Sequence, residues 1–209
     1  KEITVYNQNI SSQFWNIISQ FKQLHTLIIN GCNVNGSIDL TLIPNTIKHL
    51  NLKNNSLNEF DFEGLISFES LTLLDLSFNN IGGHIDLSYT NKLDIFRCSY
   101  NKFVGITLPH ENGYLFELKL DHNNLSGFIN ITNFGKLHAL DISDNNIDGI
   151  ALSKSKSIRQ YMELKRLILD NNQLHGVLDL YQLHYLGYIS GNNNYYNSII
   201  LPQNAQQLK

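Results

Sequence analysis

Three ring-bearing side chains, Phe78, Tyr100 and His122, stand 22 residues apart, and Asp144 follows at the same interval. If each interval returns the chain to the same place, these side chains form a column on one surface. Exposed apolar and aromatic residues flanked by charge are typical of protein-binding hot spots. The apolar and charged residues that accompany the rings are Leu73, Ile95, Arg97 and Lys119. The pattern therefore predicts a binding strip for a protein or peptide.

The same residues allow other interpretations. Phe78 and Tyr100 could stack on each other and only stabilise adjacent strands, or they could form a platform for a small ligand such as a sugar. Further along, the strip becomes acidic at Asp121, Asp141 and Asp144. Like charges repel, so we expect a basic partner segment or a cation to meet them. No metal site is predicted, because a calcium loop would need a DxDxDG-type run that the sequence lacks.

Catalytic chemistry is not indicated by the sequence. The eight histidines are scattered without the spacing of metal ligands. Ser143 and Asp144 lie one interval from His122, but no nucleophile elbow surrounds Ser143. A glycine-rich phosphate loop with its lysine is also missing. We therefore predict a protein that is not an enzyme, has no catalytic residues and uses no cofactor.

A repeated segment must position the column, and its clearest copy is 71–87, with the sequence LTLLDLSFNNIGGHIDL. Leu74 and Leu76 alternate with polar residues, which predicts a short strand with its leucines inward. Asn79 then turns inward, where its amide can bond the backbone of neighbouring turns. A GxIxL step follows on the return side. One such unit cannot bury its leucines alone, so the units must stack.

Similar units fill the chain at a period of about 22 to 24 residues. Later copies, each with its own turn asparagine, begin at Leu93, Leu115, Leu137, Leu164 and Leu186. We predict a single domain over 1–209, with an N-terminal cap at 1–23, repeats at 24–185, and a C-terminal repeat and cap at 186–209. The N-terminal cap is expected to hold a degenerate repeat and a short helix from about Ser12 to Phe21. A polar outer face is expected at the C-terminal end.

One interval is longer than the others. Leu137 and Leu164 are separated by 27 residues, and the extra length carries Lys154, Lys156 and Arg159. Its apolar spacing predicts a helix on the convex side. The basic residues form either a solvated face or a docking patch for an acidic partner.

The segment fits the pattern LxxLxLxxNxL, with apolar residues at positions 1, 4, 6 and 11 and Asn79 at position 9, so the chain resembles the leucine-rich repeat family. Its GxIxL step resembles the plant-type subclass, but the proline and the paired-cysteine caps of that subclass are missing. The resemblance implies an α/β solenoid, a right-handed horseshoe with a parallel β-sheet on its concave face. Positions 2, 3, 5, 7 and 8 of each unit are then expected to face solvent on the concave side. Members of the subclass are typically receptor ectodomains or surface recognition proteins.

Composition limits the partners. A net charge of −3 and a pI near 6.2 give no basic footprint, so nucleic acid is not an expected partner. No apolar run is long enough for a membrane helix, so direct membrane insertion is not expected. Cys32 and Cys98 fall at inward positions and are predicted to be buried free thiols.

We predict that the protein recognises a protein or peptide through its concave face, as a secreted or cell-surface module. Glycosylation sequons at Asn9, Asn35, Asn54, Asn124 and Asn130 favour that location. Two alternatives remain open: an intracellular, cytoplasmic scaffold or regulatory subunit, and a lectin-like binder of small ligands. Nothing in the sequence sets the oligomeric state.

Overall fold

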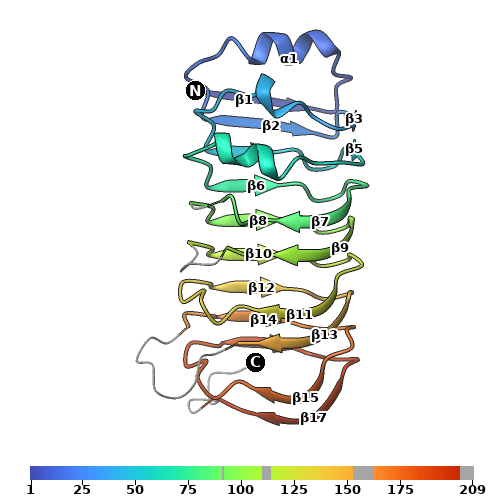
Figure 1. The fold of residues 1–209 in the computed structure, drawn as a ribbon, viewed down its shortest axis with the longest axis vertical. Helices are drawn as coiled ribbons and strands as arrows, with labels where there is room; N and C mark the ends of the chain where they lie inside the picture. The colour runs from blue at the N-terminus through green and yellow to red at the C-terminus, as the bar shows by residue number, and fades with distance from the viewer. Residues whose placement is uncertain (91, 110–113, 153–161, 203–209) are drawn as a thin grey trace.

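Short strands and turns wind the chain into a solenoid in a computed structural model that describes residues 1–90, 92–109, 114–152 and 162–202. Figure 1 shows the turns stacked along one axis, from the helix α1 (Ser12–Ile18) at one end to the last strands at the other. The predicted solenoid is therefore confirmed.

Each turn contributes one strand to a nine-stranded parallel sheet, whose strand order follows the chain. Inward-facing residues stand in register, since Leu74 aligns with Leu50 on one side and with Phe96 on the other. We call the solvent side of this sheet the sheet face. Its strands are β1 (Glu2–Tyr6), β2 (Thr26–Asn30), β4 (His49–Asn51), β6 (Leu73–Asp75), β8 (Ile95–Arg97), β10 (Glu117–Lys119), β12 (Ala139–Asp141), β14 (Arg166–Ile168) and β16 (Tyr188–Ser190).

The other side of the solenoid, which we call the opposite face, is built from four separate pairs of parallel strands. In Figure 1 their arrows run against those of the nine-stranded sheet, because the chain returns along this side. The pairs are β3 (Asn35–Gly36) with β5 (Ser56–Leu57), β7 (Gly82–Asp86) with β9 (Lys102–Thr107), β11 (Ser126–Asn130) with β13 (Asn146–Ala151), and β15 (His175–Asp179) with β17 (Tyr195–Ile200). Two 3₁₀ turns, Leu40–Leu42 and Glu63–Ser67, follow the short strands β3 and β5.

A continuous apolar core runs between the two faces. The inward leucines of adjacent strands, such as Leu50, Leu74 and Leu118, are no more than 1% exposed. Phe96 and Phe103 fill the middle of the core and contact Phe62 edge to face, with ring centroids 6.4 and 5.9 Å away. Cys32 and Cys98 are buried free thiols, as predicted.

The asparagines at position 9 join each turn to the one before it. In Asn123, Oδ1 accepts a hydrogen bond from the N–H of Phe103 at 3.1 Å. Its Nδ2 donates to the carbonyl oxygens of Cys98 and Leu120, both at 3.0 Å. These bonds pair buried backbone groups that the turn would otherwise leave bare. The same arrangement recurs at Asn79, Asn101, Asn145, Asn172 and Asn194.

The N-terminal helix is confirmed, although it ends at Ile18 rather than at Phe21. Ile18 is fully buried, while Phe14 and Trp15 pack edge to face at 5.4 Å against the core. Phe21 lies past the helix and is 41% exposed.

The C-terminal end differs from the expected polar cap in its described part. The outermost pair leaves apolar side chains exposed, among them Tyr195, Ile199, Ile200 and Leu201. Beside them, Gly191 stands where other units have an inward aliphatic side chain, and the ring of Tyr196 comes within 3.5 Å of the place where its Cβ would be. Burial raises the pKa of the Tyr196 phenol well above its usual range, and its hydroxyl has no hydrogen-bond partner in the described part of the chain.

The basic insertion, with Lys154, Lys156 and Arg159, lies outside the described residues, and so does the helix predicted for it. Met162, the first residue described after it, is buried in the core. Within the described ranges, no helix is long and apolar enough to cross a membrane.

Candidate functional site

The ring column lies just beyond the carboxyl ends of the strands rather than on them. In the nine-stranded sheet, every strand after β2 covers only positions 3 to 5 of its unit, and the chain then turns. Position 8 has a positive φ in all nine units, between 52° and 68°, with φ of 57° at Phe78 and 56° at Tyr100. The column is therefore the edge of the sheet face, in the left-handed conformation that asparagine and glycine adopt most easily.

Neighbouring rings in the column stack face to face. Phe78 and Tyr100 lie 4.4 Å apart at an interplanar angle of 14°, and Tyr100 and His122 lie 4.0 Å apart at 15°. The ammonium of Lys53 sits 5.1 Å from the centre of the Phe78 ring. Phe78 and Tyr100 nevertheless remain 42% and 43% exposed. Both faces of Tyr100 are covered, so the column presents mainly ring edges to solvent.

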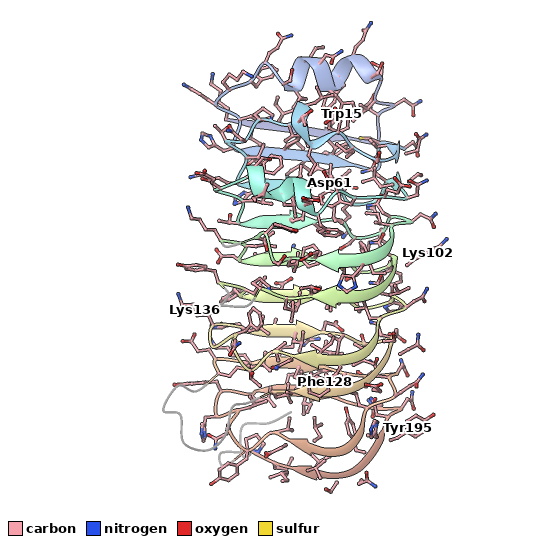
Figure 2. All side chains as sticks on the ribbon, in the orientation of Figure 1. Trp15, Asp61, Lys102, Phe128, Lys136 and Tyr195 are labelled. Atoms are coloured by element: carbon pink, nitrogen blue, oxygen red, sulfur yellow. The ribbon has the colours of Figure 1, made fainter. Side chains whose placement is uncertain are left out.

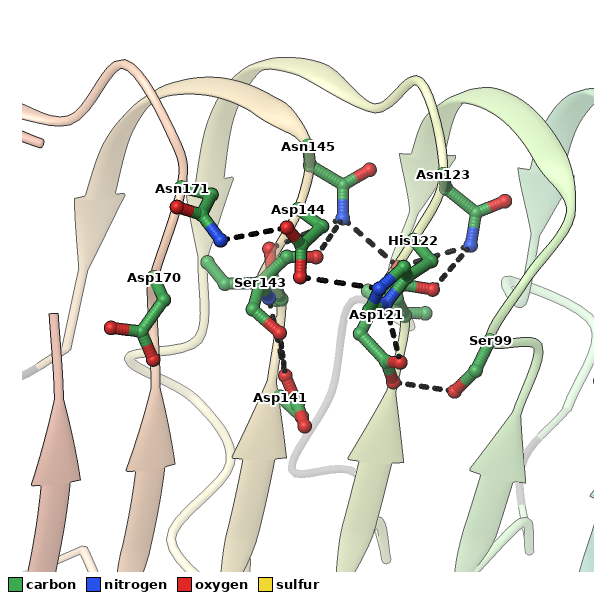
Figure 3. A network of polar contacts seen from close by, with 12 residues as sticks. Ser99, Asp121, His122, Asn123, Asp141, Ser143, Asp144, Asn145, Asp170 and Asn171 are labelled. Atoms are coloured by element: carbon green, nitrogen blue, oxygen red, sulfur yellow. Dashed lines mark hydrogen bonds and ion pairs between the residues drawn. The ribbon is translucent and has the colours of Figure 1, made fainter. Parts of the chain in front are cut away.

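The column continues as a polar ladder, which Figure 3 shows from close by. His122 places Nδ1 3.1 Å from Asp121 and Nε2 3.4 Å from Asp144. Asp144 in turn accepts a hydrogen bond from Asn171 at 2.7 Å, and Asn171 accepts one from Asn193 at 2.6 Å. Side chains at position 8 are thus linked from Phe78 to Asn193, and Lys53, at position 7 of an earlier unit, covers the Phe78 end.

Charged and apolar residues of three central strands lie beside the column. Arg97 donates a hydrogen bond from Nε to Glu117 at 2.6 Å, which raises the pKa of its guanidinium. Lys119 reaches the same carboxylate at 4.0 Å. Leu73 and Ile95 are adjacent in register and partly exposed. The predicted binding residues of β6, β8 and β10 therefore share one continuous surface.

The acidic residues are hydrogen-bonded within the protein, which changes the prediction made for them. Asp121 accepts a hydrogen bond from the hydroxyl of Ser99, and Asp141 accepts one from Ser143 at 2.7 Å. Burial raises the pKa of Asp141, against the lowering effect of that hydrogen bond. Because each carboxylate has a partner of its own, charge repulsion alone does not call for a basic segment or cation. No group of metal-ligand side chains that could hold an ion occurs among the described residues.

Two predicted solvent positions are buried in the central units. At position 7, the side chains of Ser77, Ser99 and Ser143 are buried, with 4 to 7% of their surface exposed. At position 5, Asp75 is buried, with 3% exposed. The chain bends inward directly after each short strand, so these side chains turn toward neighbouring turns. The hydroxyl of Ser143 donates its hydrogen bond to Asp141 rather than to His122. Ser143 and His122 therefore do not form a nucleophile–base pair.

A second ring cluster, which the sequence analysis missed, lies at the other edge of the sheet face. Phe116 and His138 stack with ring centroids 4.1 Å apart and an interplanar angle of 22°. Lys136 lies 5.2 Å above the ring of Tyr114, and Figure 2 shows it projecting from this edge of the stack. The signal was present, because Phe116 and His138 also stand 22 residues apart, at position 2.

Comparison with known proteins agrees with this geometry. The family model described as Leucine Rich Repeat matches residues 70–91, the segment with the clearest repeat. Residues 70–91 therefore form a leucine-rich repeat, and the whole chain has the leucine-rich repeat fold. A search of curated proteins gives no match to it. Its closer resemblance to the plant-type subclass stays a prediction.

Solved leucine-rich repeat structures share the fold at low sequence identity. InlJ from Listeria monocytogenes is 22% identical with a TM-score of 0.69, over 92% of this chain and 44% of that one. The ectodomain of the Arabidopsis receptor kinase HAESA, solved with an IDA peptide hormone, is 21% identical with a TM-score of 0.60, over 90% of this chain and 36% of that one. A plant ice-binding protein is 20% identical with a TM-score of 0.62, over 96% of this chain and 74% of that one. The chain thus spans less than half of the first two proteins.

Proposed function

We propose that this leucine-rich repeat protein binds a protein or peptide across its sheet face, through the ring column and the charged residues of β8 and β10. The contact residues would be Leu73, Phe78, Ile95, Arg97, Tyr100, Lys119, Asp121, His122, Asp141 and Asp144. Peptide binding by a similar fold, as in the HAESA ectodomain with its hormone, supports this class of function.

The backbone conformation of Phe78 and Tyr100 carries the proposal. An L-residue with a Cβ in the left-handed region costs roughly 1–2 kcal/mol, and asparagine or glycine much less. A stacked aromatic pair stabilises the fold by about 0.5–1.5 kcal/mol. Folding stability therefore gives little reason to place rings here, where most units have asparagine or glycine. Their exposed edges next to Arg97 and Lys119 are better explained by a partner.

The stacking also argues against the lectin-like alternative. A sugar would lie flat on an open ring face, but Phe78 and His122 cover the two faces of Tyr100. Ring edges carry partial positive charge and suit the carbonyl and carboxylate oxygens of a peptide.

The test compares wild type with the Phe78→Asn, Tyr100→Asn double variant, using peptides selected from a random display library on immobilised wild-type protein. Asparagine keeps the left-handed turn, so we expect unchanged or slightly higher stability and at least a tenfold loss of peptide affinity. The matched control is Phe128→Asn with Tyr195→Asn, which removes two rings of the opposite face that are 64% and 71% exposed. Full affinity in the first variant, or an equal loss in both, would overturn the proposal.

We also propose a secreted or cell-surface location. All five sequon asparagines are exposed, so each is open to a glycan. Protein isolated from its native source should lose mass on treatment with an N-glycosidase. An unchanged mass would favour the cytoplasmic scaffold instead.

A further inference from the structure

A recess of about 340 Å³ opens at the amino-terminal edge of β8, β10 and β12, away from the ring column. Ile95 lines the recess and also belongs to the strip of predicted contact residues on the sheet face. The two sites are therefore parts of one surface. Position 2 and position 8 of a unit are six residues apart in the chain, so the two edges lie at most roughly 20 Å from each other.

The floor of the recess is aromatic. Phe116 and His138 stack there, and the Phe116 ring is still 45% exposed. Among the described residues only His138 stacks on the Phe116 ring, whereas Tyr100 in the column has a ring on both faces. Planar cations bind ring faces of this kind favourably.

Hydrogen-bond acceptors surround the floor. His138 Nδ1 lies 2.8 Å from the carbonyl oxygen of Lys136, so Nδ1 carries the proton and donates it. In a neutral imidazole Nε2 is then an acceptor, yet it faces the carboxylate of Glu163 at 3.5 Å. With the imidazole neutral, both atoms are acceptors, and one donor group beside them would satisfy both; with the imidazole protonated, the two side chains form an ion pair.

The charges around the recess favour a cation. Asp94, on its rim, receives no hydrogen bond or ion pair at its carboxylate from any residue that the structure describes. Lys136 lies over the Tyr114 ring and makes no ion pair with Asp94 or Glu163. The carboxylate of Asp94 therefore remains available, and that of Glu163 has His138 as its neighbour.

We propose that this recess binds the side chain of an arginine. The guanidinium is planar and carries five N–H donors. It would stack on Phe116, donate to Glu163 and His138 Nε2, and reach Asp94. Lysine has no plane to stack, and a sugar has no charge for the carboxylates. Binding of an arginine side chain in the recess does not depend on the proposed function. Only the statement that this arginine belongs to a peptide lying across the sheet face rests on it.

The test titrates the protein with Nα-acetyl-arginine N-methylamide while the His138 ring and backbone amides are followed by NMR. We expect saturable shifts confined to the recess, with a dissociation constant on the order of 1 mM. The citrulline analogue has the same shape without the charge and should cause none. The lysine analogue should bind at least tenfold more weakly. Glu163→Gln and Asp94→Asn should each weaken arginine binding at least threefold, whereas Glu59→Gln, an exposed carboxylate elsewhere, should not.

Equal shifts with citrulline, or no saturation by arginine, would overturn the proposal. Saturation by methyl glucoside in its place would make the recess a sugar site and would also overturn it. The Phe78→Asn, Tyr100→Asn variant should bind the arginine probe normally. Loss of library peptides in that variant and loss of the probe in the Glu163 variant therefore report on two separate claims.

Discussion

A single asparagine side chain completes the backbone of two turns. Asn123 is 7% exposed, and its amide bonds backbone groups of its own turn and of the turn before. Deleting one partner of a buried hydrogen bond leaves the other unsatisfied, which costs about 1–3 kcal/mol. Position 9 is therefore where a small change does most damage to the fold.

Replacing Asn123 with alanine should lower the free energy of unfolding by about 2–4 kcal/mol, because several buried backbone groups lose their partners. Asn124→Ala is the matched control, since Asn124 is exposed and its side chain makes no hydrogen bond with any residue that the structure describes. It should change stability by about 0.5 kcal/mol or less. Urea denaturation of both variants measures the difference. Similar losses in the two would show that the amide ladder is not what holds the turns.

Position 8 shows how far the sequence could be read at this scale. The period located the column correctly, and the inward role of Asn79 followed from the pattern. The left-handed backbone was not predicted, although asparagine, glycine and aspartate at six of the nine positions were its signal. The aromatic residues Phe78 and Tyr100 obscured this signal, because aromatic side chains are rare in the left-handed conformation.

Adjacent strands give similar carboxylates opposite environments. Asp141, in β12, is partly buried, and this desolvation raises its pKa despite hydrogen bonds from Ser143. Asp170 follows β14. Burial there would also raise the pKa, but hydrogen bonds from Ser190 and Asn192 outweigh it and lower the pKa. The fold thus disfavours the charged form of Asp141 and favours that of Asp170.

The two residues should therefore affect stability with opposite signs. Asp141→Asn should stabilise the protein at pH 7, because the penalty for the charged form is present above the raised pKa and disappears as pH falls below it. Asp170→Asn should destabilise it at pH 7, because a lowered pKa gives stability that is lost as pH falls through the folded value. Denaturation at pH 7 and at about pH 2.5 checks both. The same sign in both variants at neutral pH would contradict this account.

At the level of elements, the existence and order of the strands could be predicted from the alternation of leucines. Not all of the solvent-facing positions could be predicted in this way. The expected exposure of position 7 assumed a strand that continues. The strand in fact ends at position 5, which turns Ser77 and Ser99 inward. The recess was missed because it joins side chains from several turns, and no single repeat contains it.

Each turn contacts chiefly its neighbours, so stability should vary along the stack. Central strands such as β10 have a partner on both sides, whereas β16 is the outermost strand of its sheet. In hydrogen exchange we expect amides of β8 to β12 to be the slowest and those of β16 and β17 the fastest among the strands. Uniform protection would indicate that the whole stack opens as a single unit.

The direction of the asparagine ladder has a consequence for synthesis on the ribosome. Each asparagine of this ladder, at position 9, bonds the turn that precedes it, so a turn lacks partners for its buried N–H groups until the next one has emerged. Growth from the N-terminal helix onward therefore completes one turn at a time, always one repeat behind the exit tunnel. A pause in translation would leave the newest turn open to proteases and chaperones while all earlier ones are already closed.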